Sequence, residues 1–349
     1  MKFIIKKSFI ILVFLFFTLF SKSSYSDSLR VEDYGIITLM YHRFEENKYP
    51  STNIRISNFK KQVDLIKNNN FYFVNANKFE NDLKFNKEKK KVLLTIDDAF
   101  LSFYQNAWPI LKKEKIPFIL FVSTREVGKF NYMTWNQIRE IAKEKFVYIG
   151  NHSHTHEYLA DMPSSEIIKD IDKSINIFEK EIGKKSDFFS YPFGEYNLDF
   201  KKIIIDKGFK YAFGQHSGVS DETKDFFELP RFPINEKYGE IERFKTILNT
   251  LPLKYKNIYP SEKYINEKTN PPEVIIEFFN DINNLKNLTC YSNEEDKWRE
   301  SEIKFIGDFK IKINLKGKFT SERGRINCSL KEANGSWRWL GMQFVVSEK

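Results

Sequence analysis

The chain has 349 residues, of which 41% are hydrophobic and 30% charged, a composition that excludes a disordered chain and indicates a folded globular protein. This length accommodates one large α/β domain and a smaller second domain. The formal net charge of +9 comes from lysines scattered along the sequence, and the absence of a basic stripe with interleaved aromatic residues argues against a nucleic-acid partner.

Residues 1–26 have the pattern of a secretory signal peptide. Early lysines precede an apolar run from Phe9 to Phe20, and residues 24–26 (SYS) form a small-x-small cleavage site. The apolar run is shorter than the ~20 residues that cross a bilayer, which favours cleavage over the alternative of an uncleaved anchor. We therefore expect a secreted or periplasmic protein that has no stable membrane insertion after cleavage.

Apolar runs suited to buried strands alternate with amphipathic helical segments from Ile36 to about Leu251. The strands are expected at residues 37–41, 92–96, 118–122, 146–149, 188–191, 211–213 and 231–234. Thr134 and Gln137 fit a helical capping box, and Gly183 ends a helix that starts near residue 164. Alternating strands and helices predict a parallel sheet, and about seven such units favour a barrel over an open sheet.

The C-terminal part has a different pattern. Prolines 252, 260, 271 and 272 in a polar, lysine-rich stretch predict a linker over residues 252–272. Beyond it the hydrophobic period changes to two, as in residues 309–315 (FKIKINL), which is typical of strands. We expect an α/β domain over residues 27–251 and a small β-sandwich-like domain over residues 273–349.

The two cysteines of the sequence, Cys290 and Cys328, both fall in this last segment. Export to an oxidising compartment favours a disulfide between them. Two separate buried thiols are the alternative.

Two of the predicted strands end in side chains that suit a metal ion. The strand at 146–149 leads into a loop with His152, His154 and His156, and the strand at 92–96 ends on Asp97 and Asp98. Paired imidazoles with a carboxylate are the ligands of a catalytic Zn²⁺, which keeps an open position for water. His152 and His156 are the expected ligands, and His154 is expected to point away.

Asp97 and Asp98 cannot both face inward on a regular strand, because neighbouring side chains alternate between its faces. They are therefore expected where the strand breaks into a loop, in different roles. One would ligate the metal, and the other would act as general base on water. A pair of helix-capping aspartates is the alternative.

Three motifs resemble those of the polysaccharide deacetylases, the NodB-homology enzymes of carbohydrate esterase family 4. Residues 95–99 (TIDDA) resemble the TFDDG motif, and residues 152–156 (HSHTH) resemble the H-[ST]-x-x-H zinc motif. Residues 190–194 (SYPFG) are similar to the third motif, in the form found in biofilm poly-N-acetylglucosamine deacetylases. The resemblance covers about residues 36–234 and implies a distorted (β/α)7 barrel of the polysaccharide deacetylase type.

The resemblance also implies roles for individual residues. Asp97 would be the general base, and the ligands of Zn²⁺ or another divalent metal would be Asp98, His152 and His156. The substrate groove would be lined by Tyr191, Pro192 and Phe193, with the backbone N–H of Phe193 helping to hold the oxyanion.

The chain departs from the family pattern at several positions. Ala99 replaces the motif glycine, and Ser190 stands where many members have an arginine. Arg231 is a candidate to orient the general base from another strand, and a surface arginine beside a proline is the alternative. The family's C-terminal catalytic histidine is absent from its usual place.

His42 is the candidate for the missing general acid. Residues 39–42 (LMYH) are similar to an N-terminal L-x-Y-H motif of the biofilm deacetylases, which implies that His42 protonates the leaving amine. The alternatives are a histidine that only packs at a strand end, and His216 as the acid.

These observations predict a metal-dependent hydrolase that removes N-acetyl groups from an extracytoplasmic polysaccharide containing N-acetylhexosamine. The polysaccharide is the expected partner. An O-acetyl esterase acting on an acetylated glycan, or a non-catalytic carbohydrate-binding protein on the same fold, are the alternatives.

Overall fold

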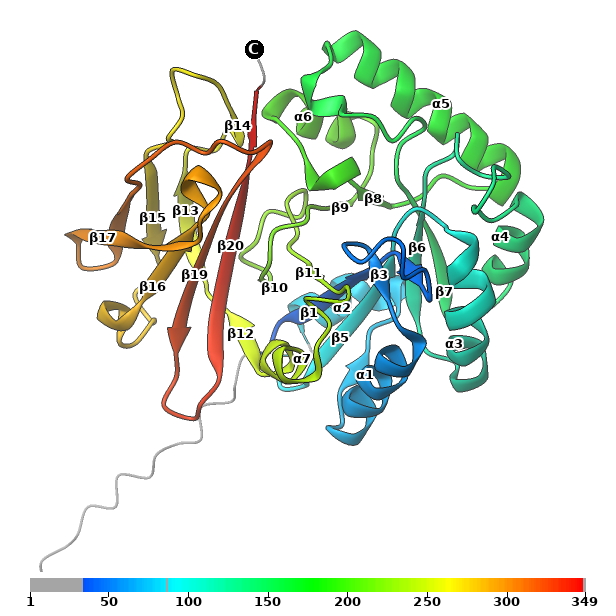
Figure 1. Cartoon of the computed structure of the whole chain (residues 1–349), viewed down its shortest axis with the longest axis horizontal. Coiled ribbons are helices and arrows are strands. Elements are labelled where there is room, and N and C mark those ends of the chain that lie inside the picture. The colour runs from blue at the N-terminus through cyan, green and yellow to red at the C-terminus, as the bar shows by residue number, and fades with distance from the viewer. Residues whose placement is uncertain (1–33, 86, 348–349) are drawn as a thin grey trace, which may run out of the picture. The chain divides into compact units, whose positions relative to one another are not determined.

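The computed structural model of the chain describes residues 34–85 and 87–347 (Figure 1). The predicted signal peptide at residues 1–26 lies outside these residues. Within the described part of the chain, no helix combines the length and the apolar character that a membrane span requires.

The first sheet is built mainly from parallel strands. Its order is β10-β1-β5-β6-β7-β8-β9, and β4 and β11 join it by pairing with β5 and β1. The strands are β1 (Ile36–Tyr41), β4 (Tyr72–Phe73), β5 (Lys91–Ile96), β6 (Phe118–Val122), β7 (Val147–Asn151), β8 (Phe188–Ser190), β9 (Tyr211–Phe213), β10 (Val219–Ser220) and β11 (Phe232–Pro233). Strand β10 pairs with β1 in the antiparallel sense, and the other neighbours are parallel.

Residues 229–233 connect the two ends of this sheet. Leu229 forms a parallel bridge with Phe213 of β9. A few residues later β11 pairs with β1, where Phe232 lies opposite Leu39. The sheet therefore curls back on itself, which confirms the α/β barrel expected from the sequence, with residues 229–233 in the place of its seventh strand.

Helices pack against the outside of the curled sheet. They are α1 (Ile56–Asn68), α2 (Phe79–Lys84), α3 (Trp108–Glu114), α4 (Trp135–Ala142), α5 (Ser164–Ile182), α6 (Leu198–Asp206) and α7 (Ile241–Leu248). The capping box predicted at Thr134 and Gln137 is formed, and Gly183 ends α5 with a φ of 81°. The barrel strands are buried on both faces, which explains why they are continuous apolar runs rather than alternating ones.

The second sheet is mostly antiparallel, with the order β12-β20-β19-β16-β17-β18-β15-β13, and β14 pairs with β20. Its strands are β12 (Thr250–Pro252), β13 (Tyr255–Tyr259), β14 (Tyr264–Ile265), β15 (Val274–Phe278), β16 (Thr289–Ser292), β17 (Arg299–Gly307), β18 (Lys310–Asn314), β19 (Arg323–Lys331) and β20 (Trp337–Val346).

The linker expected at residues 252–272 is not seen. Strand β13 pairs with β15, and β14 pairs with β20, so this segment belongs to the second sheet. Its prolines lie at strand ends, where they interrupt no pairing: Pro252 is the last residue of β12 and Pro260 follows β13. Prolines that end short strands were therefore misread as marks of an unstructured connection.

Strand β17 makes the second sheet fold over. Its first residues pair with β16 and its later residues pair with β18. As a result, Ile276 and Ile311 from one half of the sheet share a hydrophobic core with Ile326 and Leu340 from the other half. This is the β-sandwich-like arrangement expected for the C-terminal part.

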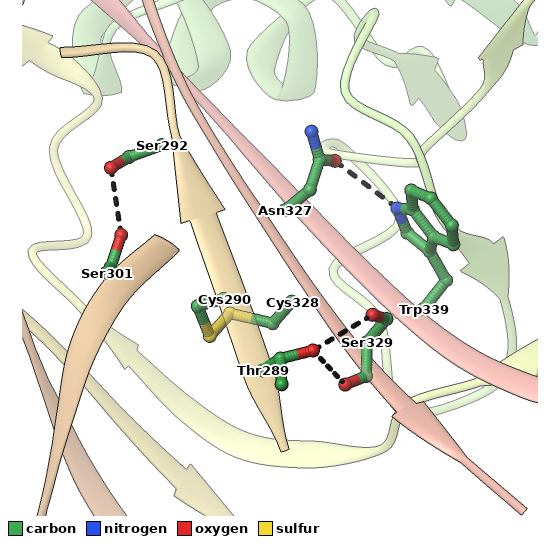
Figure 2. Close-up of a disulfide and its surroundings, with 8 residues drawn as sticks. All are labelled: Thr289, Cys290, Ser292, Ser301, Asn327, Cys328, Ser329 and Trp339. Atoms are coloured by element: carbon green, nitrogen blue, oxygen red, sulfur yellow. Dashed lines mark hydrogen bonds between the residues drawn. A yellow bond between two sulfur atoms is a disulfide. The ribbon is translucent and has the colours of Figure 1, made fainter. Parts of the chain in front are cut away.

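Cys290 and Cys328 form the predicted disulfide inside this core (Figure 2). They lie directly opposite each other on β16 and β19. The two residues are 38 positions apart in the sequence. In the chain-entropy model, closing a loop of this size stabilises the folded state by about 4 kcal/mol.

Strand β19 alternates strictly between two environments. Ile326 and Cys328 are buried in the sandwich core, whereas Arg325, Asn327 and Ser329 are only partly buried on the opposite face. In Figure 2 the disulfide lies on one side of β19, and the side chains of Asn327 and Ser329 point away from it. The outward face of β19 therefore presents polar and basic side chains.

The outward face of the second sheet contacts loops of the barrel. Gly218 forms a bridge with Leu340 of β20. A Cβ atom on the neighbouring Gly341 would lie 2.3 Å from the carbonyl oxygen of Ser217, so only glycine permits this close approach. The loop at residues 214–218 and strand β20 are thus packed backbone to backbone.

Candidate active site

The predicted site residues come together because the barrel strands are parallel. His42 follows β1, Asp97 follows β5, His152 follows β7 and Ser190 ends β8. The carboxyl ends of parallel strands lie at one edge of a sheet, so residues far apart in the sequence share a single rim.

Three of these side chains form a cluster that can hold a metal ion. One carboxylate oxygen of Asp98 lies 3.3 Å from Nε2 of His156 and 3.5 Å from Nε2 of His152. The three candidate ligand atoms all lie within 4.8 Å of one another. The donor set, two imidazoles and one carboxylate, is of the kind that binds catalytic divalent metals.

The backbone around the cluster is held in left-handed conformations. Asp98, Ala99 and His156 have φ values of 73°, 54° and 54°. Such conformations are costly for residues other than glycine and persist where the surrounding structure enforces them. Asp98 thereby leaves the strand direction, so the two adjacent aspartates point to different partners, as the sequence required.

His152 is oriented by a hydrogen bond on its far side. Its Nδ1 lies 2.7 Å from the backbone carbonyl oxygen of Ser190, to which it donates, and this leaves Nε2 free to face Asp98. Burial lowers the pKa of His152 to about 4, against the opposing charge of Asp97. The ring is therefore neutral near pH 7, which is the form that ligates metals.

His154 points away from the cluster, in agreement with the prediction. Its Nδ1 lies 2.8 Å from the hydroxyl of Thr124. The loop is also anchored by Asp170 of α5, whose carboxylate accepts hydrogen bonds from the backbone N–H groups of His154 and Thr155. No sequence pattern marks Asp170 for this role, because it lies within an ordinary amphipathic helix.

Asp97 is fully buried and bound by an arginine. Arg231 donates to both carboxylate oxygens, over distances of 2.7 and 2.8 Å. The hydroxyl of Ser190 accepts from Arg231 at 2.8 Å and donates to Asp97 at 3.3 Å. Burial alone would raise the pKa of Asp97, but the charge of Arg231, together with His152 and His42, holds it well below its usual range.

Arg231 therefore lies in the core of the site and is not the surface arginine of the alternative interpretation. It is fully buried, and its Nε donates to the carbonyl oxygen of Gly214. Residues 229–233 close the barrel next to β1, which brings this guanidinium over the end of β5. An arginine from the closing strand thus contacts Asp97 directly, and the Ser190 hydroxyl forms a hydrogen bond with each of the two side chains.

Replacing Arg231 with leucine is expected to lower the free energy of unfolding by about 3–5 kcal/mol, because it leaves the buried Asp97 carboxylate without a partner. Urea unfolding at neutral pH measures this change. The matched control is Arg139→Leu, which breaks a partly exposed ion pair with Glu181 and should cost less than about 1 kcal/mol. An equally small loss for Arg231→Leu would contradict the assignment.

His42 and His216 both line the cleft described below, but their charged neighbours differ. Burial lowers the pKa of His42, against the opposing charges of Asp98 and Asp97. Burial lowers the pKa of His216 to about 4, against the opposing charge of Glu228. Of the two histidines, His42 is therefore the one beside the paired aspartates.

The third motif is only partly exposed to substrate. The side chains of Tyr191 and Pro192 are buried, and Tyr191 packs among the aromatic rings of a core cluster. The expectation that these two side chains line the groove is therefore wrong, because the strand β8 geometry turns them inward. Phe193 does line the cleft, with a left-handed φ of 58°.

The second sheet holds Phe193 in place. Gln343 of β20 donates from Nε2 to the carbonyl oxygens of Phe193 and Gly194, each at 3.2 Å. Arg323 of β19 lies over the ring of Phe193, 5.3 Å from its centroid, and forms an ion pair of 2.6 Å with Glu195. The C-terminal strands thus contact the motif loop directly.

A cleft of about 770 Å³ opens beside the metal cluster. This volume is in the range of small-molecule sites. One wall comes from the barrel, including His42, Asp98 and His156, and the other comes from the second sheet, including Tyr291, Trp298 and Arg325. The residues of the first wall were predictable from sequence motifs, whereas those of the second wall were not predicted. The alternation in residues 323–329 (RGRINCS) is the one sequence signal for a polar outer face there.

Comparisons with known proteins agree with this fold and this cluster of candidate ligands, and they indicate a hydrolase of the carbohydrate-deacetylating class. The family model described as "Polysaccharide deacetylase" matches residues 84–212. Residues 84–212 are therefore similar to a polysaccharide deacetylase domain.

Several relatives share this likeness. The poly-beta-1,6-N-acetyl-D-glucosamine N-deacetylase of Staphylococcus aureus (strain MRSA252) is 27% identical over 237 residues, which cover 60% of this chain and 81% of that protein. The IcaB structure from Ammonifex degensii superposes with a TM-score of 0.57 at 25% identity, covering 62% of this chain and 97% of the other. The Streptococcus pyogenes deacetylase PplD, solved with acetate, has a TM-score of 0.56 at 23% identity over 61% and 98%, which supports the fold.

Proposed function

We propose that the protein is a metal-dependent hydrolase that removes N-acetyl groups from an extracytoplasmic polysaccharide containing N-acetylhexosamine. The observation that carries this proposal is that the adjacent residues Asp97 and Asp98 have different partners. Asp98 joins His152 and His156 in a metal-binding geometry, while Asp97 is held ionised by Arg231 beside them. The N-deacetylase relatives support the reaction type.

The residues present fit a divalent metal. Asp98, His152 and His156 would hold it, and two imidazoles with one carboxylate suit Zn²⁺, although other divalent metals accept the same donors. When bound there, a divalent cation supplies Lewis-acid chemistry to the acetamide carbonyl and to water.

The chain's own residues divide the proton transfers. Asp97 is the general base that accepts a proton from the attacking water, and Arg231 keeps it ionised and oriented. Among the described residues, the N–H groups of Gly194 and Glu195 donate to backbone carbonyls, but no acceptor pairs with the N–H of Phe193. This free N–H is suited to the developing oxyanion.

His42 is the general acid in this proposal. It lines the cleft together with Asp98 and His156. An imidazole can carry a proton to an amine near neutral pH. Burial lowers the pKa of His42, and the carboxylates of Asp98 and Asp97 oppose this shift. The buried disulfide agrees with a protein exported to an oxidising compartment, secreted or periplasmic.

Acetate release tests the proposal. The protein loaded with Zn²⁺ should release acetate from an N-acetylated polysaccharide such as poly-β-1,6-N-acetylglucosamine, and a chelator should remove the activity reversibly. A panel that includes O-acetylated glycans of matched length separates the alternatives. Release from the esters alone would indicate an O-acetyl esterase, and binding without release from any glycan would indicate a non-catalytic binding protein.

A further inference from the structure

The outward face of the second sheet forms the cleft wall opposite the metal cluster. On β19 this face includes Arg323, Arg325, Asn327 and Ser329, and all four line the cleft. Tyr291 of β16 lies opposite Asn327 in the sheet register, and Trp339 of β20 lies opposite Ser329. These residues form a continuous patch on one face of the sheet, and this patch faces the cleft in which a substrate would bind.

The charge of the cleft is strongly one-sided. In the described part of the chain, Asp98 is the one acidic side chain in the lining, and it belongs to the metal cluster. The lining also contains four lysines and arginines, namely Lys237, Arg243, Arg323 and Arg325. Arg323 pairs with Glu195, whose pKa burial raises to about 7, and the other cations of the cleft lining are Lys237, Arg243 and Arg325.

Arg325 and Arg243 are half-buried, and neither has a carboxylate within ion-pair distance among the described residues. The side chain of Arg325 makes no hydrogen bond in this part of the chain, and Arg243 donates through one nitrogen to the carbonyl oxygens of Tyr238 and Pro233. The Arg243 guanidinium also lies over the ring of Tyr238, 5.0 Å from its centroid.

Both arginines are charged at neutral pH. Burial lowers the pKa of Arg325 and of Arg243, and Tyr238 acts in the opposite direction on each. Guanidinium groups nevertheless stay protonated in proteins. Removing a guanidinium charge from water without pairing it costs free energy. A ligand that brings an anion to these two arginines would therefore bind with a favourable free energy.

Aromatic rings accompany these charges. Trp298 and Tyr291 are 50% and 42% exposed, which is unusual for large rings, and both line the cleft. Exposed flat rings present an apolar face on which the apolar face of a sugar ring can pack. Trp339 is fixed by a hydrogen bond from its indole N–H to Asn327, which leaves the amide nitrogen of Asn327 available (Figure 2).

We propose that this wall, together with Arg243 of α7, is a glycan-binding surface that selects an anionic polysaccharide, with a carboxylate or phosphate on a unit near the N-acetylhexosamine that is cleaved. Arg325 and Arg243 bind the acidic group, and Trp298 and Tyr291 support neighbouring sugar rings. This inference rests on the proposed deacetylase function and names its substrate class.

The test compares three N-acetylated oligosaccharides of equal length: a neutral N-acetylglucosamine homo-oligomer, one with alternating uronic acid, and one with phosphodiester links. Acetate release is measured with the Zn²⁺-loaded wild type, Arg325→Gln and Arg243→Gln. We expect the wild type to favour an anionic substrate, and each variant to raise its KM by about 10- to 100-fold, the value of a charge-assisted hydrogen bond, with kcat nearly unchanged. The uronate and phosphodiester arms distinguish the two sources of negative charge.

The matched control is Lys331→Gln, which removes one positive charge at the exposed end of the same strand, outside the cleft. It should leave KM unchanged on all three substrates. Equal or better turnover of the neutral oligomer by the wild type, or equal effects of the arginine variants on neutral and anionic substrates, would overturn the inference while leaving the proposed function standing.

Calorimetric binding of the same oligosaccharides to Zn²⁺-loaded Asp97→Asn protein separates the two claims further. One outcome is that anionic oligomers bind in an arginine-dependent way while the wild type releases acetate from no substrate. This outcome would refute the deacetylase function but would support the binding of anionic glycans by this wall. An absence of both binding preference and release would refute both.

Discussion

Asp97→Asn is expected to keep the metal and to lower kcat by about 10²- to 10⁴-fold, the usual contribution of a general base. Asparagine has nearly the same shape and can still contact Ser190 and Arg231, but it cannot accept a proton from water. The variant is compared with wild type by acetate release and by metal content per chain.

Asp206→Asn is the matched control for this change, because Asp206 is an exposed aspartate on α6 that pairs with Lys202. It should leave both metal content and turnover unaffected. Circular dichroism must show that Asp97→Asn is folded, since the substitution leaves Arg231 without a counter-charge. Normal turnover in folded Asp97→Asn protein would remove Asp97 from the mechanism.

His156→Ala is expected to lose the metal and all activity above background, whereas His154→Ala should keep both. His156 provides one of three ligands, and a site with two protein ligands binds divalent metals far more weakly. The two histidines lie in one loop, two residues apart, so the pair controls for general damage to that loop. His154 contacts Thr124 on the far side.

Metal content after dialysis against a weak chelator is the measurement that decides between the two histidines. Retention of one metal ion per chain by His156→Ala would refute its role as a ligand. Loss of the metal in His154→Ala with retention in His156→Ala would reverse the assignment within the loop.

The grouping of Asp98, His152 and His156 was predictable because it depends on local features of the chain. Asp98 follows one apolar strand directly, and His152 and His156 follow another. Parallel strands bring such ends to the same rim whatever the details of packing. The motifs in residues 95–99 and 152–156 therefore located the metal cluster and separated His154 from the ligands.

Partners from other strands were harder to predict. Whether Arg231 faces Asp97 or solvent depends on how residues 229–233 close the barrel, and the sequence left both open. The choice between His42 and His216 also depended on which histidine faces the carboxylates. The inward turn of Tyr191 and Pro192 could not be read from a three-residue strand followed by a turn.

By itself the sequence determined the α/β character of the first domain, the β character of the second, the disulfide and the metal cluster, because periodicity, spacing and strand-end chemistry act over a few residues. Only the tertiary structure decided that Arg231 holds Asp97, that residues 252–272 belong to a sheet, and that β19 completes the cleft. Some of these features depend on contacts between segments 100 or more residues apart, such as Arg231 with Asp97 and Gln343 with Phe193. The others depend on which strands pair in a sheet. Such contacts follow from how whole sheets pack, which no short stretch of sequence encodes.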